Sequence, residues 1–407
     1  MPSTGPSIET ATAKPISARI EAIDILRGLA LFGVLAINLD TEFRVTFFEQ
    51  FLPSPASAVP LDRAVRGFLK WAIEFKAFSL FSFLFGMGLA MQFEHLAGRS
   101  DRLTLLIRRL LALLAFGLFH LVLIWDGDIL TEYALAGFVV LPLLFAPRGV
   151  VAASAGIALL FFLALPWLPI SFGFPDRAWL TAHVAVAREV YAHGTFTAIL
   201  AFRVSEIPYI APLHGYVFSR TVALMLLGGL VWRSGLIADA AKHGKWLGGA
   251  AIALLGAGIL LSLLMSGTLA PIGLALAGAS ATLADALLPV VLAIGYAAAV
   301  VWVVSCSRYR SLLAWAAPIG QMAFTSYIAE SVLLGLIFYG YGYGFGLMGK
   351  LGVAAALAVG LSVYTAQVFF SRWWLQSHLF GPLEWLWRTV MYGERQPWRR
   401  LAACGQG

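Results

Sequence analysis

The sequence predicts an all-α fold: a polytopic bundle of about ten transmembrane helices. Hydrophobic residues make up 60% of the 407 residues and charged residues only 12%, about half the charged share of a soluble domain. Apolar segments follow one another from Ile20 to Phe370 with short joins, and a helix needs about 20 apolar residues to cross a bilayer. We therefore expect one transmembrane domain over residues 20–371 and no separate soluble domain.

Apolar runs of spanning length give the order of the predicted helices. They lie near residues 22–40, 68–92, 103–124, 129–146, 149–168, 212–234, 245–266, 283–305, 312–338 and 349–371. Most of the 28 Lys and Arg residues fall at inner helix ends when both termini are placed in the cytosol, as the positive-inside rule requires. Residues 169–211 are then the longest non-spanning stretch, and they face outward.

The two ends of the chain differ from the apolar middle. Residues 1–19 are rich in Pro, Ser, Thr and Ala, which predicts a disordered cytosolic tail rather than a cleavable signal peptide. Residues 372–407 are aromatic and basic, which predicts a cytosolic segment lying in the membrane interface.

Ionisable side chains within spans cost free energy to insert, so they indicate function. In the first span Asp24, Arg27 and Asn38 fall close to one helical face, and Asp24 can pair with Arg27. In the third span Arg109 and His120 are 11 positions apart, which puts them on one face, roughly 16.5 Å apart along the axis. Each helix thus offers a cation at its inner end and a polar group at its outer end.

Two carboxylates follow His120 in a short turn. Asp126 or Asp128 can orient the imidazole, which is the arrangement of a general base. The structural interpretation is that His120 donates to a backbone carbonyl and Asp128 caps the next helix, with Gly127 making the turn. Glu330 lies in the outer half of the ninth span, at a depth similar to that of His120. We predict that these two side chains lie within about 10 Å of each other.

Glycines and arginines add two further expectations. Gly86 and Gly88 in the second span can allow close helix approach. Arg108 and Arg109 belong to the densest basic cluster of the chain. These arginines either keep this end of the spans on the cytosolic side, next to anionic lipid, or alternatively bind phosphate groups.

Absent motifs exclude several classes of function. The sequence has no GxxxxGK[ST] loop, no Rossmann glycine fingerprint, no HExxH and no Cys-x-x-Cys, so nucleotide hydrolysis, nicotinamide chemistry and a metal centre lack support. The net charge of +7 comes from residues dispersed between apolar runs, which argues against nucleic-acid binding.

Four stretches together resemble the YeiB-like bacterial membrane proteins, domain-of-unknown-function family 418. These stretches are RIEAIDILRGLALFGVLAINL at 19–39, FSLFSFLFGMG at 78–88, RRLLALLAFGLFHLVLIWDGDILTEYALAG at 108–137 and GPLEWLWR at 381–388. The resemblance implies a multi-pass protein of the bacterial cytoplasmic (inner) membrane. It also implies a distant similarity to transmembrane acyltransferases, which take the acyl group from cytosolic acyl-CoA. Where the family pattern reads Asn-Tyr-x-x-Gln-Ser, this chain has Ser326 and Glu330 in place of the amides.

The sequence and the resemblance together favour a membrane-bound acyltransferase. His120 is the expected general base, oriented by Asp126 or Asp128, with Asn38 as an oxyanion donor and Glu330 nearby. Arg27, Arg108 and Arg109 are expected to bind the phosphates of acyl-CoA, and no other cofactor is expected.

Two rival functions and one partner stay open. The polar groups could instead form the path of a transporter or flippase for a lipid-linked or small amphipathic solute, or could only specify helix packing in a scaffold. Besides the lipid bilayer, a second copy of the chain is a potential partner, because the small residues of later spans can pack against it.

Overall fold

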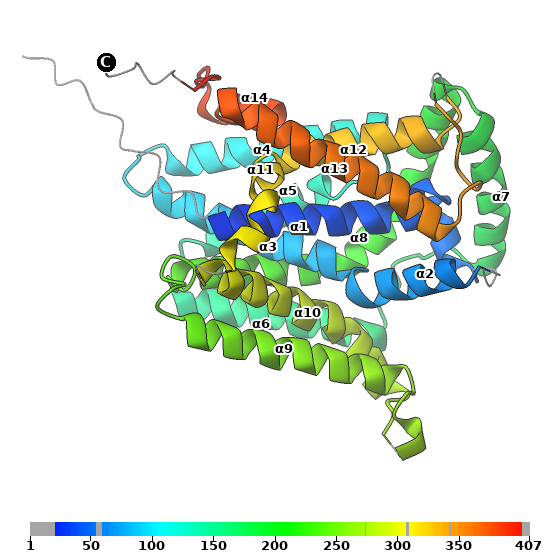
Figure 1. The fold of residues 1–407 in the computed structure, drawn as a ribbon, viewed down its shortest axis with the longest axis horizontal. Helices are drawn as coiled ribbons and strands as arrows, with labels where there is room; N and C mark the ends of the chain where they lie inside the picture. Colours follow the sequence, from blue (N-terminus) through cyan, green and yellow to red (C-terminus); the bar gives the residue numbers. More distant parts are fainter. Residues whose placement is uncertain (1–20, 54–58, 273, 307–308, 342–343, 401–407) are drawn as a thin grey trace, which may run out of the picture.

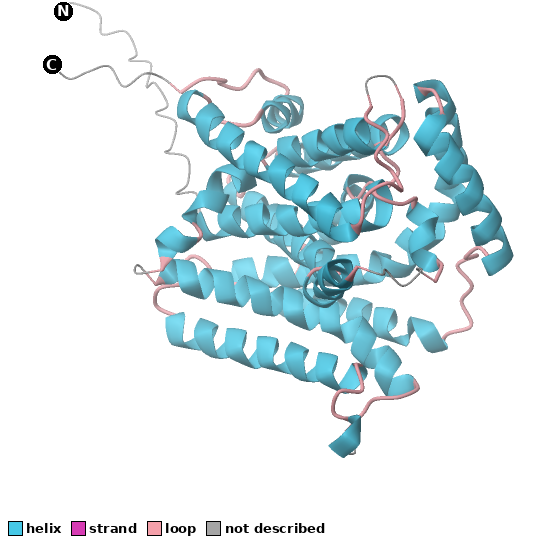
Figure 2. Cartoon of the chain, turned by 45° about the vertical axis from the view of Figure 1, so that its right-hand side comes forward, coloured by secondary structure: helices cyan, strands magenta, loops and turns pink. Residues whose placement is uncertain are grey.

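The computed structural model describes residues 21–53, 59–272, 274–306, 309–341 and 344–400. Its helices are α1 (Glu21–Asn38), α2 (Pro60–Ala72), α3 (Lys76–His95), α4 (Arg102–Phe119), α5 (Leu130–Leu143), α6 (Arg148–Ala164), α7 (Arg177–His193), α8 (Phe196–Arg233), α9 (Gly244–Met265), α10 (Ala279–Ser305), α11 (Ala317–Gln321), α12 (Ala323–Phe338), α13 (Val353–Ser377) and α14 (Pro382–Tyr392). Most of them lie side by side along one direction (Figure 1, Figure 2). The predicted all-α bundle is confirmed.

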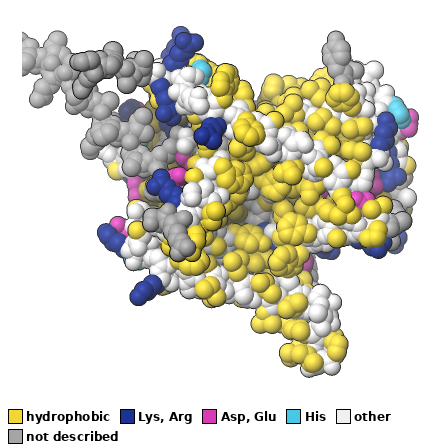
Figure 3. Space-filling model, viewed as in Figure 1, with side chains coloured by type: hydrophobic (Ala, Val, Ile, Leu, Met, Phe, Trp, Pro, Cys, Tyr) yellow, Lys and Arg dark blue, Asp and Glu magenta, His cyan; other side chains and the backbone are white. Residues whose placement is uncertain are grey.

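Membrane-spanning character follows from length and composition. In the described part of the chain, eight helices are long and apolar enough to cross a bilayer. A ninth span results if Ala314–Gln321 and Ala323–Phe338, which meet at an angle of 81°, are counted as one. Helix α5 is apolar but shorter than these. Figure 3 shows an apolar middle on one face, with Lys and Arg gathered toward its two ends, as expected of a protein in a bilayer.

Glycines allow the closest helix contacts, as predicted for the second span. A Cβ atom on Gly86 would lie 1.9 Å from the carbonyl oxygen of Met225, so α3 and α8 pack backbone to backbone. The equivalent atom on Gly320 would lie 1.7 Å from the carbonyl oxygen of Asp24, which brings α11 onto α1. These contacts bring the polar positions of α1, α3 and α8 to the inside of the bundle.

Residues 169–211 are more helical than the sequence pattern indicated. Helix α7 lies across one end of the bundle (Figure 1), and α8 begins at Phe196 rather than near residue 212. The first half of α8 carries Arg203 and Glu206, both almost fully buried. Glu206 accepts a hydrogen bond from Tyr191 and lies 2.7 Å from His183 Nε2, so its charge is satisfied against α7.

The predicted ends of the chain are described only in part. Residues 1–19 lie outside the described residues. Beyond the last predicted span, α13 continues to Ser377 and α14 packs beside α4.

Candidate functional site

The chain leaves regular α geometry where the candidate base lies. Helix α4 ends at Phe119, and His120 begins a π-helical turn that runs to Ile124 before Trp125 becomes extended. A second π-helical turn, Leu39–Phe43, follows Asn38 at the end of α1. Such turns widen the helix and are frequent at functional sites. Both turns pack against α12.

His120 and Asp128 form a fully buried pair. The Nδ1 atom of His120 lies 2.9 Å from Oδ1 of Asp128, and both side chains are 0% exposed. In the tautomer in which Nδ1–H donates to this carboxylate, the lone pair lies on Nε2. Nε2 has no hydrogen-bond partner in the described residues. The imidazole is therefore oriented with its basic nitrogen unoccupied.

Asp128 also holds the next helix. Its Oδ2 atom accepts a hydrogen bond of 2.7 Å from the backbone N–H of Thr131, in the first turn of α5. The structural role predicted for Asp128, capping this helix, and its orienting role thus occur together, one on each oxygen. The cap fixes the carboxylate, which in turn fixes the imidazole of His120.

Asp126 faces a different partner. Its Oδ1 atom lies 3.8 Å from Nε of Arg203 on α8. Burial raises the pKa of Asp126, and the Arg203 guanidinium opposes that rise. Of the two candidate carboxylates, Asp128 is the one in contact with His120.

The predicted neighbours of His120 lie on α1 and α12. The His120 ring lies 5.1 Å from the ring of Tyr327, one turn before Glu330 on α12. No hydrogen bond or ion pair joins His120 to Glu330 in the described residues, and their predicted proximity stays a prediction. Asn38 Oδ1 and Glu330 Oε1 are each buried without a hydrogen-bond partner.

A further histidine–carboxylate pair was not predicted from the sequence. His214 Nδ1 on α8 lies 2.6 Å from Oε2 of Glu132 on α5, and the hydroxyl of Thr221 donates to the other oxygen of Glu132. This pair lines a cavity, which the turn residues Gly127 and Ile129 also line. The sequence signal was the presence of two ionisable residues in apolar segments, but their 82-residue separation hid the contact.

Arg27 and Arg109 converge at the opposite end of the bundle. Arg27 lies 3.4 Å from Asp24, as predicted. A Cβ atom on Gly88 would lie 3.0 Å from Nη2 of Arg27, and Nη1 of Arg109 lies 3.5 Å from the carbonyl oxygen of the same glycine.

Arg109 also contacts side chains of two other helices. Its guanidinium donates to Gln92 Oε1 and lies over the Trp387 ring of α14, 4.8 Å from the centroid. Arg108, the next residue, is exposed and lies near the position of Gly393 at the end of α14.

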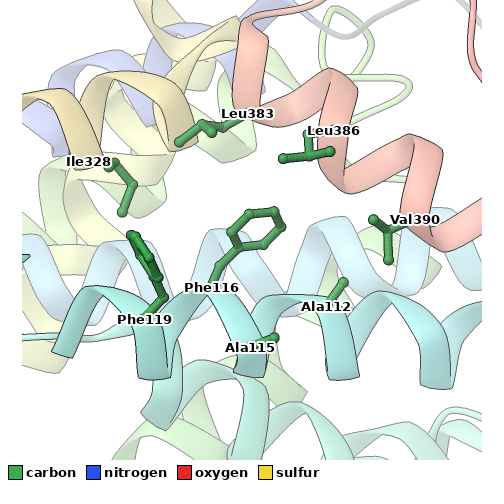
Figure 4. Close-up of a pocket in the computed structure, with 8 residues that line it drawn as sticks. All are labelled: Ala112, Ala115, Phe116, Phe119, Ile328, Leu383, Leu386 and Val390. Carbon is green, nitrogen blue, oxygen red and sulfur yellow. The ribbon is translucent and has the colours of Figure 1, made fainter. Parts of the chain in front are cut away.

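An apolar groove runs between α4, α12 and α14 (Figure 4). Its volume is about 470 Å³. It is lined by Ala112, Ala115, Phe116, Phe119, Ile328, Leu383, Leu386 and Val390. On α4 the lining residues recur every three or four positions, which is one face of the helix.

Glu384 of α14 anchors the start of α12. One oxygen of its carboxylate accepts from the backbone N–H groups of Phe324 and Thr325, at 2.8 and 3.1 Å. The other accepts from the Thr325 hydroxyl at 2.5 Å. A carboxylate is favoured here because the first N–H groups of a helix lack partners and point toward it. The closing motif Gly-Pro-Leu-Glu-Trp therefore positions the helix that covers His120.

The fold and these sites together define a multi-pass helical membrane protein with a buried histidine–aspartate pair. The chain belongs to the DUF418 family, the family of YeiB. A family described as "Protein of unknown function (DUF418)" matches residues 231–394.

Relatives match over most of the chain. The uncharacterized protein YxaH of Bacillus subtilis is 35% identical, over 93% of this chain and 96% of its own length. The uncharacterized protein YeiB of Escherichia coli is 29% identical, over 90% of this chain and 95% of its own. No solved structure matches. The relatives are bacterial, and the predicted family is confirmed.

Proposed function

We propose that this protein is an acyltransferase of the bacterial cytoplasmic membrane. It takes an acyl group from cytosolic acyl-CoA and transfers it to a hydroxyl or amine acceptor that lies in the membrane or beyond it. The observation that carries the proposal is the buried His120–Asp128 pair, in which Nε2 of the oriented imidazole has no hydrogen-bond partner among the described residues.

In the proposed reaction His120 acts as the general base. Its Nε2 atom takes the proton of the acceptor O–H or N–H as the acceptor atom attacks the thioester carbonyl. Asp128 stabilises the imidazolium that forms, and Asn38 donates to the developing oxyanion. Collapse of the tetrahedral intermediate breaks the carbon–sulfur bond, and the imidazolium returns the proton to the departing thiolate. The products are the acylated acceptor and free CoA.

Arg27 and Arg109 support the position of the donor. They converge at the end of α4 opposite His120, and Arg108 adds an exposed guanidinium. Guanidinium groups match phosphate oxygens well. The span of roughly 16.5 Å between positions 109 and 120 suits the length of a pantetheine arm. The apolar groove beside α4 offers space for the chain of a long acyl group.

Access to His120 requires a local movement. The side chain is 0% exposed, and the Tyr327 ring lies over it. The proposed reaction therefore includes displacement of Tyr327 or of the turn that carries Asp128, as happens when a lid opens over an active site.

A specific observation favours a transporter as the second candidate. The cavity beside His214 lies between helices and is lined by the ionisable residues Glu132, His214 and Arg220 among apolar ones, and a solute path would require such groups. A transporter predicts solute movement across the membrane without acyl-CoA. The acyltransferase predicts acyl-CoA affinity.

Thermal stability against a panel of acyl-CoAs tests the proposal. Purified protein in detergent is heated with acetyl-CoA, palmitoyl-CoA, free CoA or ATP, as wild type, Arg109→Ala, His120→Ala and the exposed-lysine control Lys245→Ala. A ligand that binds only the folded state raises the midpoint. We expect an acyl-CoA-dependent rise in wild type, His120→Ala and the control, and its loss in Arg109→Ala. No rise with any CoA would contradict the proposal and favour the transporter.

A further inference from the structure

The cavity beside the Glu132–His214 pair is distinct from the His120 site. It has a volume of about 100 Å³ and lies between the π-helical turn after α1 and helices α3, α5 and α8. His120 does not line it. The cavity therefore fits a small molecule or a head group, and nothing in the proposed transfer step uses it.

One wall of the cavity holds a buried guanidinium that makes no ion pair within the described residues, although the Glu132 carboxylate acts on it at longer range. Arg220 is 7% exposed, and it makes no hydrogen bond or ion pair in the described residues. Its Nε atom is buried without a partner. Its contacts are with aromatic faces, at 5.7 Å from the Phe75 centroid and 5.4 Å from that of Phe162. Burying an unpaired charge is costly, so this position calls for an anionic group from outside the chain.

Glu42, which also lines the cavity, has an oxygen that lacks a hydrogen-bond donor among the described residues. Its Oε2 atom is buried without a hydrogen-bond partner, and it lies so close to Gly127 that a Cβ atom there would be 2.1 Å from it. Glu74 also lines the cavity; Lys70 and Lys76 act on it electrostatically, but it makes no hydrogen bond or ion pair among the described residues. Carboxyl oxygens without a partner accept hydrogen bonds. These two positions call for a group with several N–H donors.

Among the described residues, the Glu132–His214 pair gives Arg220 no ion-pair partner and gives Glu42 and Glu74 no hydrogen-bond donor. Both oxygens of Glu132 already accept hydrogen bonds, from His214 and Thr221. The imidazole of His214 is 31% exposed. The pair thus forms a fixed polar part of the cavity wall.

The mouth of the cavity carries backbone strain. Phe75 has φ of 60°, the one non-glycine residue with positive φ in the described chain. This conformation is unfavourable for a bulky residue, and such strain clusters at ligand sites. It places the Phe75 ring beside Arg220, at the point where α2 gives way to α3.

We infer that this cavity binds a small zwitterion, or the zwitterionic head group of a larger molecule. Its carboxylate or phosphate is held by Arg220, and its primary ammonium by Glu42 and Glu74. The chemistry is shared by an α-amino acid and by phosphoethanolamine, whether free or at the head of a lipid. A quaternary ammonium is excluded because it has no N–H to donate. The inference does not depend on acyl transfer.

Isothermal titration of the detergent-purified full chain tests the inference. The probes are glycine and phosphoethanolamine, with ethanolamine and inorganic phosphate as single-charge controls and phosphocholine as the quaternary control. A further arm compares thermal stability in nanodiscs of phosphatidylethanolamine and phosphatidylcholine, which identifies a lipid head group. We expect one zwitterion to bind at least about tenfold more tightly than each control, the effect of one charge-assisted hydrogen bond.

Variants locate the binding in the cavity. Arg220→Gln and Glu42→Gln should each weaken it about tenfold or more. The exposed controls Lys245→Gln and Glu189→Gln should leave it unchanged. Val217→Phe fills the cavity without removing a charge and should abolish binding, which covers the case in which a charge variant does not fold.

Two outcomes would overturn the inference. One is that no zwitterion binds in either format. The other is that ethanolamine binds as tightly as the zwitterions and Arg220→Gln does not weaken them. Because His120 lies outside the cavity, His120→Ala should keep this binding, so its loss of acyl transfer and the failure of this inference are distinguishable.

Discussion

Removing the carboxylate of Glu384 should destabilise the protein by about 3 kcal/mol. Three donors on α12 lose their acceptor in Glu384→Ala: the N–H groups of Phe324 and Thr325 and the Thr325 hydroxyl. A buried donor left without a partner costs about 1–3 kcal/mol. We use the lower end for each donor because these bonds are only partly buried. Glu384→Gln keeps one acceptor oxygen and should cost about 1 kcal/mol.

The free energy of unfolding in mixed micelles measures this effect. Glu394→Ala is the matched control, because Glu394 is exposed and follows α14; surface changes of this kind stay within about 0.5 kcal/mol. Since Glu384 anchors the helix that carries Tyr327 and Glu330, the alanine variant should also lose acyl-CoA stabilisation. A Glu384→Ala protein as stable as the Glu394→Ala control would refute this role of the closing motif.

Two further perturbations follow from packing and burial. Gly86→Ala should destabilise the protein by about 2 kcal/mol or more, because the added methyl group overlaps the backbone of Met225. The control Gly98→Ala meets open space and should change the midpoint of thermal unfolding little. Equal midpoints for the two variants would contradict the close contact. Burial raises the pKa of Glu384, so the stabilisation that comes from this pKa difference is fully present below the unfolded pKa of about 4.3 and is lost as the pH rises through the folded value; the hydrogen bonds from α12 are a separate contribution. A pH series in that window should therefore show a steeper loss of stability in wild type than in Glu384→Gln, and parallel curves would count against it.

The sequence predicted the class of fold because hydropathy reports burial in lipid directly. It located most helices for the same reason. It misplaced the start of α8 because Arg203 and Glu206 resemble loop residues when their partners are unknown. Those partners, Asp126, His183 and Tyr191, lie on other segments, and the pairing exists only after the chain has folded.

The candidate site was predictable where its members are close in the sequence. His120 and Asp128 are eight positions apart, and the turn between them allows the contact found at 2.9 Å. The choice between Asp126 and Asp128 needed the structure, since it depends on Arg203. The Glu132–His214 pair needed it too, because α5 and α8 meet only through tertiary packing.

The central claim is that His120 is the general base of acyl transfer, and single-turnover release of free thiol from acyl-CoA tests it most directly. Purified protein is mixed with acyl-CoA and candidate acceptors, as wild type, His120→Ala, Asp128→Asn and the exposed-histidine control His243→Ala. The account predicts thiol release by wild type and by the control, with both site variants slower by about 10²–10⁴-fold, the contribution of general base catalysis. Full activity in both site variants would contradict it.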